Sequence, residues 1–137
     1  MAHPIRKTIR LRGYDYAQPG YYFITICTHN REKLFGRIVG ADSISAQTGR
    51  TDGVGPNCAR VELNDAGAMI EAIYSQMETE FRNIILHEHI VMPNHLHGII
   101  QICAPGRADM ESTPTLARII QTFKRLTTIK YAEGVRN

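Results

Sequence analysis

Residues 84–102 read IILHEHIVMPNHLHGIIQI, and this stretch decides the fold. Residues 84–92 and 95–102 are rich in isoleucine and other apolar residues, which is typical of buried strands. Only Pro93 and Asn94 separate the two runs. The sequence therefore predicts two antiparallel strands joined by a tight turn.

Side chains alternate in direction along a strand, so we expect His95 and His97 on one face, about 7 Å apart, and Leu96 on the other. Two imidazoles on one face make a natural two-ligand site for a divalent metal. The spacing alone leaves a second interpretation open, in which both are ordinary histidines on an exposed sheet face.

The two-residue turn predicts the register of this hairpin, with Met92 opposite His95 and Ile90 opposite His97. Strict alternation would then place Glu88 on the face of the histidine pair, as a candidate third ligand. A single bulge would reverse the parity and bring His87 and His89 there instead.

The rest of the chain supplies two helices and a first strand. The predicted elements begin with a strand over 21–27, a long polar loop insertion over 36–57 and a short strand over 61–63. A helix capped by Asn64 or Asp65 then runs to about Phe81. The last helix is opened by Ser112 or Thr113 with Pro114 and ended by Gly134. Tyr21 and Tyr22 are assigned to the core or edge of the first strand. The order β-α-β-β-α predicts one α+β domain over residues 1–137, with the antiparallel sheet of a ferredoxin-like fold, two helices on one face and the final strand missing.

The composition is that of a globular chain, with 43% hydrophobic and 21% charged residues. No apolar run approaches the roughly 20 residues that a membrane-spanning helix needs, so we expect no membrane association and a cytoplasmic protein. Cys27, Cys58 and Cys103 form no pair with metal or disulfide spacing, which favours buried or incidental reduced thiols.

The net charge of +3 permits a polyanionic partner. The basic residues gather near the two ends, and those that we expect to contact DNA phosphates are Arg6, Lys7, Arg10, Arg12, Lys124 and Arg125. A solvated basic surface is the alternative. Tyr14 and Tyr16 beside the first group either stack on unpaired bases or simply pack on the surface.

Three segments together carry a family resemblance: MPNHLHG at 92–98, RLRGYDYAQPGYYFITICTHNR at 10–31 and IIQTFK at 119–124. They resemble single-tyrosine HUH transposases, in particular the branch of insertion-sequence and REP-associated tyrosine transposases. The anchors cover most of the chain, and the 36–57 loop is the part without a match.

The resemblance implies that His95 and His97 hold a divalent cation, Mg²⁺ or Mn²⁺, which polarises a DNA phosphate. It further implies that a tyrosine cuts single-stranded or hairpin DNA through a 5′-phosphotyrosine intermediate, in a protein that acts as a monomer or a homodimer.

The nucleophile itself is not matched by the resemblance. Tyr131 is the tyrosine that follows His97, but the family places its nucleophile on a later helix, which would lie beyond Asn137. We therefore expect a truncated chain without the final strand, the tyrosine helix and the third ligand.

Two other hypotheses remain open on the sequence. One is a catalytically inactive, truncated or domesticated DNA-binding module. The other is an unrelated ferredoxin-like metal-binding or regulatory protein in which the two histidines are coincidental.

Overall fold

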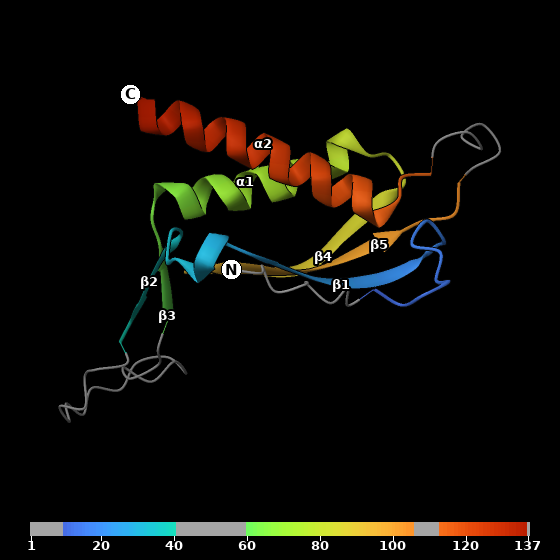
Figure 1. Cartoon of the computed structure of the whole chain (residues 1–137), viewed down its shortest axis with the longest axis horizontal. Helices are drawn as coiled ribbons and strands as arrows, with labels where there is room; N and C mark the ends of the chain where they lie inside the picture. The colour runs from blue at the N-terminus through green and yellow to red at the C-terminus, as the bar shows by residue number, and fades with distance from the viewer. Residues whose placement is uncertain (1–9, 41–59, 106–112, 137) are drawn as a thin grey trace, which may run out of the picture.

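A computed structural model describes residues 10–40, 60–105 and 113–136, and it shows an α+β chain with two helices and antiparallel sheets. Its elements are β1 (Gly20–Cys27), the 3₁₀ turn η1 (His29–Arg31), β2 (Gly36–Val39), β3 (Arg60–Leu63), α1 (Asp65–Glu80), β4 (Ile84–Met92), β5 (His95–Ile102) and α2 (Leu116–Arg136). One sheet has the strand order β1-β5-β4, and β2 pairs with β3 in a second, smaller sheet (Figure 1).

The β4–β5 hairpin has the predicted register beside its turn. Met92 lies opposite His95 and Ile90 opposite His97. Further along, the register shifts between Leu86 and His89. The prediction from simple periodicity therefore holds near the turn and fails beyond the bulge, because one extra residue reverses the direction of every side chain that follows.

The bulge separates the two histidines of β4. His89 lies opposite Gly98 and packs against the Tyr74 ring on the helical side, at a centroid distance of 4.8 Å. The Nε2 atom of His87 instead lies 2.9 Å from Oε1 of Gln101 on the other side of the sheet. The two histidines therefore lie on opposite sides of the sheet, so the bulge does not bring both of them to the face of His95 and His97.

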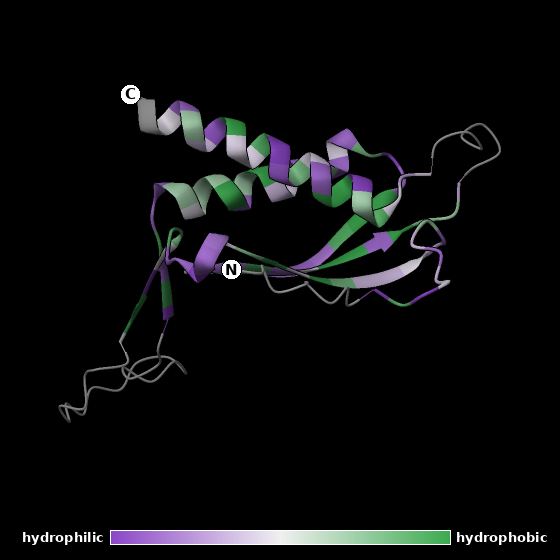
Figure 2. Cartoon of the chain, in the orientation of Figure 1, coloured by the Kyte–Doolittle hydropathy of each residue, from purple (hydrophilic) through white to green (hydrophobic). Residues whose placement is uncertain are grey.

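Both helices cover the same face of the three-stranded sheet (Figure 1). Figure 2 shows hydrophilic and hydrophobic residues alternating along α2, as expected of a helix with one buried side. The core that the helices share with the sheet contains Tyr22, Ile24, Ile70, Ile73, Tyr74, Met77, Ile84, Val91, Leu96, Ile100, Ile102, Ile119 and Phe123. Leu96, between the two histidines of the motif, is one of the least exposed side chains and anchors β5 to the helices.

Asn64 caps α1, as predicted, because its side chain accepts a hydrogen bond of 2.9 Å from the backbone N–H of Gly67. The start of α2 differs from the prediction. The helix begins at Leu116, and the hydroxyl of Thr115 accepts a hydrogen bond from the Arg118 N–H at 3.2 Å. The prediction that Thr113 opens the helix is therefore wrong, because Thr115 caps it two residues later, and Ser112 lies outside the described residues.

The prediction that Gly134 ends α2 is wrong, because the helix continues to Arg136. A glycine ends a helix when it adopts a positive φ, and Gly134 is not among the residues that do.

The first residues of the predicted 36–57 loop form a strand instead. In β2, Gly36 pairs with Leu63 and Val39 with Arg60 of β3. A four-residue strand is too short for periodicity to reveal. The predicted strand at 61–63 is confirmed as β3, and residues 41–59 lie outside the described part of the chain.

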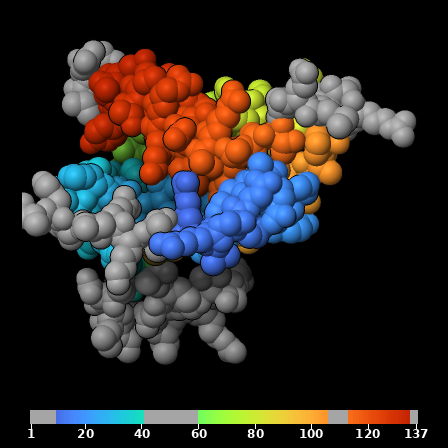
Figure 3. Space-filling view, turned by 45° about the vertical axis from the view of Figure 1, so that its right-hand side comes forward, coloured from blue at the N-terminus to red at the C-terminus, as the bar shows by residue number. Residues whose placement is uncertain are grey.

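The segment before β1 packs along the start of α2, as the contact between blue and orange atoms in Figure 3 shows. The backbone N–H of Leu116 donates to the carbonyl of Tyr16 at 3.1 Å. Tyr14 and Tyr16 lie with ring centroids 4.9 Å apart, and both contact Tyr22. Of the two hypotheses for Tyr14 and Tyr16, this geometry favours packing over base stacking.

In the described ranges, no helix has the length and apolar character needed to cross a membrane.

Candidate metal and nucleic-acid site

No described helix covers the face of the three-stranded sheet away from α1 and α2, and this face carries the histidine motif. Alternate residues of β5 and of its neighbour β1 lie on it. These are Tyr21, Phe23, Thr25 and Cys27 of β1, and His95, His97, Ile99 and Gln101 of β5. We call this surface the open face. In the β1–β5 register, Thr25 lies opposite His97 and Cys27 opposite His95.

His95 and His97 lie side by side on the open face. Their ring centroids are 4.5 Å apart, and the ring planes meet at 73°. Both side chains are half-buried. The structure therefore places both rings on one face and in contact with each other, as the alternation of side chains predicts.

Each of the two rings is held by a hydrogen bond at Nδ1. The Nδ1 of His95 lies 2.7 Å from Oδ1 of Asn94, and the Nδ1 of His97 lies 2.9 Å from Oγ1 of Thr25. An amide oxygen only accepts, so the His95 proton sits on Nδ1 in the neutral ring. Both bonds are made at Nδ1 and not at Nε2, and such outer partners orient the histidines of metal sites.

The electrostatics of the site favour a neutral His95. Burial lowers the pKa of His95 from its ordinary value, and the nearby charges of His97 and Arg31 lower it further. A metal competes with protons for the imidazole nitrogen. The lowered pKa keeps the nitrogen lone pair of His95 available near neutral pH.

The η1 turn is a part of the site that sequence reasoning missed. Asn30 and Arg31 adopt positive φ values of 52° and 56°, and the Asn94 amide donates to the Arg31 carbonyl at 3.3 Å. Thr28 is tied to Asn94 as well, through its backbone N–H at 3.0 Å. These bonds hold η1 against the hairpin turn and bring the charge of Arg31 near His95. No local sequence signal indicates that contact between distant segments.

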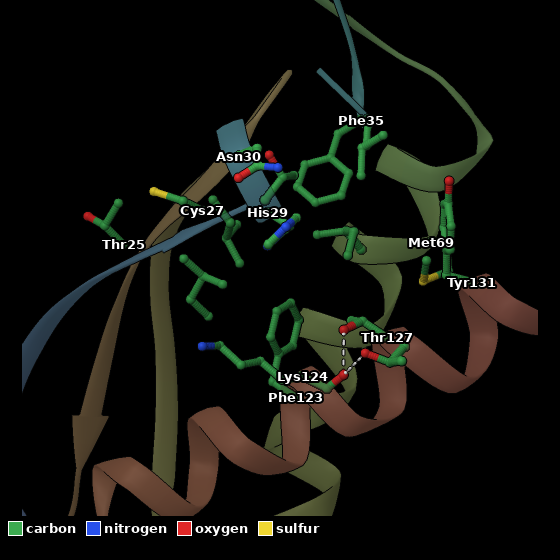
Figure 4. A pocket seen from close by; sticks show the side chains of 16 residues that line it. Thr25, Cys27, His29, Asn30, Phe35, Met69, Phe123, Lys124, Thr127 and Tyr131 are labelled. Atoms are coloured by element: carbon green, nitrogen blue, oxygen red, sulfur yellow. Dashed lines mark hydrogen bonds between the residues drawn. The ribbon is translucent and has the colours of Figure 1, made fainter. Parts of the chain in front are cut away.

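The predicted DNA-binding cations that the structure describes lie on two segments, the one before β1 and α2. Arg12 is exposed in the segment before β1, and Arg125 is exposed on α2. Lys124 on α2 lines a cavity of about 620 Å³ between β1, η1 and the two helices (Figure 4). Arg10 is exposed in the segment before β1, and Arg6 and Lys7 lie outside the described residues.

Tyr131, the candidate nucleophile, is not brought together with the histidines. It is partly exposed on α2, which covers the helical face, and it lines the same cavity. Figure 4 shows Tyr131 beside Met69, with Thr25 pointing away on the far side of β1. His95 and His97 project from the opposite face of the sheet, so this chain does not aim Tyr131 at them.

The other position expected for the nucleophile was a helix beyond Asn137. The described part of α2 ends at Arg136, and Asn137 itself lies outside the described residues. A tyrosine on a later helix therefore stays a prediction.

The imidazoles of His95 and His97 could fill two of the coordination positions of a divalent cation. Among the described residues, no group of three His, Cys, Asp or Glu side chains is placed to hold a metal. Glu88 therefore does not join the pair as a third ligand, because it lies at the bulge of β4 where the expected parity is lost. Two imidazoles would leave the remaining coordination positions open for oxygen ligands such as phosphate.

The two described cysteines, Cys27 and Cys103, are free thiols. Cys27 is exposed and Cys103 half-buried, which favours incidental over buried thiols, and Cys58 lies outside the described residues.

Comparison with known proteins gives a relative without an assigned role. An uncharacterized protein of Haemophilus influenzae (strain ATCC 51907 / DSM 11121 / KW20 / Rd) is 36% identical over 97 residues, which cover 71% of this chain and 44% of that protein. The chain thus matches less than half of the relative's length. No family model matches the chain. No solved structure matches it either.

Proposed function

We propose that this chain is the metal-binding part of a single-tyrosine HUH transposase, which cuts and rejoins single-stranded or hairpin DNA in the cytoplasm. The observation that carries the proposal is the pair of half-buried imidazoles, 4.5 Å apart, with both Nδ1 atoms engaged. The order β1-β5-β4, with both helices on one face, supports a ferredoxin-like plan for the domain.

In this proposal, the residues of the chain bind and orient a scissile phosphate. His95 and His97 would hold Mg²⁺ or Mn²⁺ through Nε2, and Asn94 and Thr25 would keep the two rings in place. When bound, the cation neutralises charge on the phosphate. Arg31, near His95, adds a positive charge that favours a phosphate at the same place.

Cleavage and strand transfer through a 5′-phosphotyrosine are proposed for a whole protein rather than for these 137 residues. The position of Tyr131 behind the sheet favours a second candidate for this chain alone, a DNA-binding module without cleavage. The two candidates share the metal site and differ in whether a tyrosine reaches it. The two candidates are distinguished by whether a 3′-labelled strand becomes covalently attached to the protein, because a 5′-phosphotyrosine links the protein to the fragment on the 3′ side of the cut.

The experiment that tests the site is Mn²⁺ binding, followed by the electron paramagnetic resonance signal of free Mn²⁺. We expect the native chain to bind Mn²⁺, and the His95→Ala/His97→Ala double variant to lose that binding, because both Nε2 ligands are gone. His29→Ala is the matched control, since His29 is an exposed histidine of η1. Equal Mn²⁺ binding by the native chain and the double variant would refute the ligand assignment.

A further inference from the structure

The two most exposed aromatic side chains of the described chain lie on the open face. Tyr21 and Phe23 on β1 each keep 68% of their surface exposed. The sequence assigned Tyr21 to the strand core or its edge, whereas Tyr22 alone points into the core. Because the two rings lie two residues apart on one face, they form a continuous apolar patch, and such patches are typical of binding surfaces.

Each of the two rings contacts a histidine. Phe23 stacks on His97 with a centroid distance of 5.3 Å and an interplanar angle of 24°. Tyr21 lies 5.3 Å from the ring of His87, which in turn contacts Gln101. The aromatic surface therefore begins at a proposed metal ligand and runs along β1 away from it.

We propose that Tyr21 and Phe23 are a stacking platform for unpaired bases of single-stranded DNA whose phosphate lies at His95 and His97. This inference rests on the proposed function and adds residues that position the strand. Residues two apart on a strand place their side chains about 7 Å apart on the same face. A strand that leaves the histidine pair along β1 therefore meets Phe23 first and Tyr21 next.

Three features of the open face favour DNA over a protein partner. It carries hydrogen-bonding groups suited to base edges and phosphates, namely Thr25, His87 and Gln101. The phosphate end of the platform has the positive charge of Arg31. Aromatic faces bind every base, since all bases have a π-face, so a strand of any sequence can use the two rings.

The first test compares two single-stranded ligands by fluorescence anisotropy with the full chain. One is an oligothymidylate of about 12 nucleotides, within the usual range of site sizes. The other has the same number of phosphates but is abasic. Tyr21→Ala/Phe23→Ala should weaken oligothymidylate binding by about tenfold or more, since two stacking contacts are lost. Binding of the abasic strand should change little, because its phosphates meet the same cations.

Conservative and distant substitutions serve as controls. Tyr21→Phe/Phe23→Tyr keeps both rings and should keep the native affinity. Ile38→Ala removes an accessible apolar side chain from β2, in the other sheet, and should leave both ligands unaffected. The three variants change exposed residues, and their thermal unfolding will show whether each retains the native fold.

A direct reporter uses the absence of tryptophan from the chain. Phe23→Trp introduces a single indole on the open face, and a stacked base should quench its fluorescence as oligothymidylate is added. The abasic strand should bind without this quenching. Ile38→Trp, on β2, should show no quenching with either ligand.

The outcomes separate this inference from the proposed function. Loss of Mn²⁺ binding in the histidine double variant, together with unchanged oligothymidylate affinity in Tyr21→Ala/Phe23→Ala, would refute the platform and leave the metal site standing. A native chain that binds neither Mn²⁺ nor oligothymidylate would refute both. Quenching of the indole in the Phe23→Trp variant by the oligothymidylate, and no quenching by the abasic strand, would support the platform.

Discussion

The two faces of the three-stranded sheet are built from alternate residues of the same strands, yet they differ in almost every property. The helical face is apolar and buried beneath α1 and α2. The open face carries histidines, hydroxyl and amide groups and two exposed rings. On β5, Leu96 and Ile100 belong to the first, while His95 and His97 belong to the second.

This difference shows how stability and function are separated along one strand. Burial of apolar side chains on the helical face stabilises the fold, because it removes apolar surface from water. The open face then carries polar groups without placing them in the core. A change on one face should therefore alter stability with little effect on binding, and a change on the other should do the reverse.

The largest effect is expected from neighbouring isoleucines that point to opposite faces. Ile84 is 4% exposed and Ile85 is 44% exposed, although both lie on β4. Ile84→Ala should lower the free energy of unfolding by about 2–5 kcal/mol, since it leaves a cavity. Ile85→Ala loses the same β-branched side chain and should cost about 0.5 kcal/mol. Urea unfolding followed by circular dichroism measures both values, and equal costs would contradict the two-face description.

The next effect concerns Gly98, which lies on the helical side of β5 directly after His97. A Cβ atom at this position would overlap the hydroxyl of Tyr74. Gly98→Ala should therefore destabilise the fold by about 1–3 kcal/mol through overpacking.

The Tyr74 hydroxyl is buried without a hydrogen-bond partner among the described residues, and burial raises the Tyr74 pKa to about 12. On a Tyr74→Phe background, Gly98→Ala should cost less, because the nearest overlapping atom is gone. Thermal unfolding of the two single variants and the double variant measures this coupling. Purely additive costs would show that Tyr74 is not what constrains Gly98.

Much of the fold follows from the sequence. The hairpin at residues 84–102, its turn and the pairing of Ile90 with His97 were all predicted, because a two-residue turn fixes the register. The bulge after Leu86 was not located, since nothing in LHEH indicates where an extra residue enters the strand. The start of α2 was placed too early, because the hydroxyl of Thr115 caps the helix, and no local signal indicated that the helix continues through Gly134.

For the candidate site, the sequence identified the two proposed ligands but not their surroundings. The placement of His95 and His97 on one face follows from alternation alone. Thr25 was missed because its role depends on the pairing of β1 with β5, which joins residues 72 positions apart. Phe23 and Arg31 were missed for the same reason, since each meets the histidines only through contacts between distant segments.

The smallest effect, and the one confined most strictly to the open face, concerns the hydroxyl of Thr25. Thr25→Val keeps the shape of the side chain and removes the bond to Nδ1 of His97. We expect Mn²⁺ affinity to fall by about tenfold, a typical cost of losing an outer partner of a metal-bound histidine. Thr25→Ser keeps the hydroxyl and should keep the affinity. Because Thr25 is exposed, thermal stability should barely change in either variant. Calorimetric titration with Mn²⁺ measures the affinity of each variant. If the valine and serine variants bind Mn²⁺ equally well, the ring of His97 is held by its stacking on Phe23 rather than by the hydroxyl of Thr25.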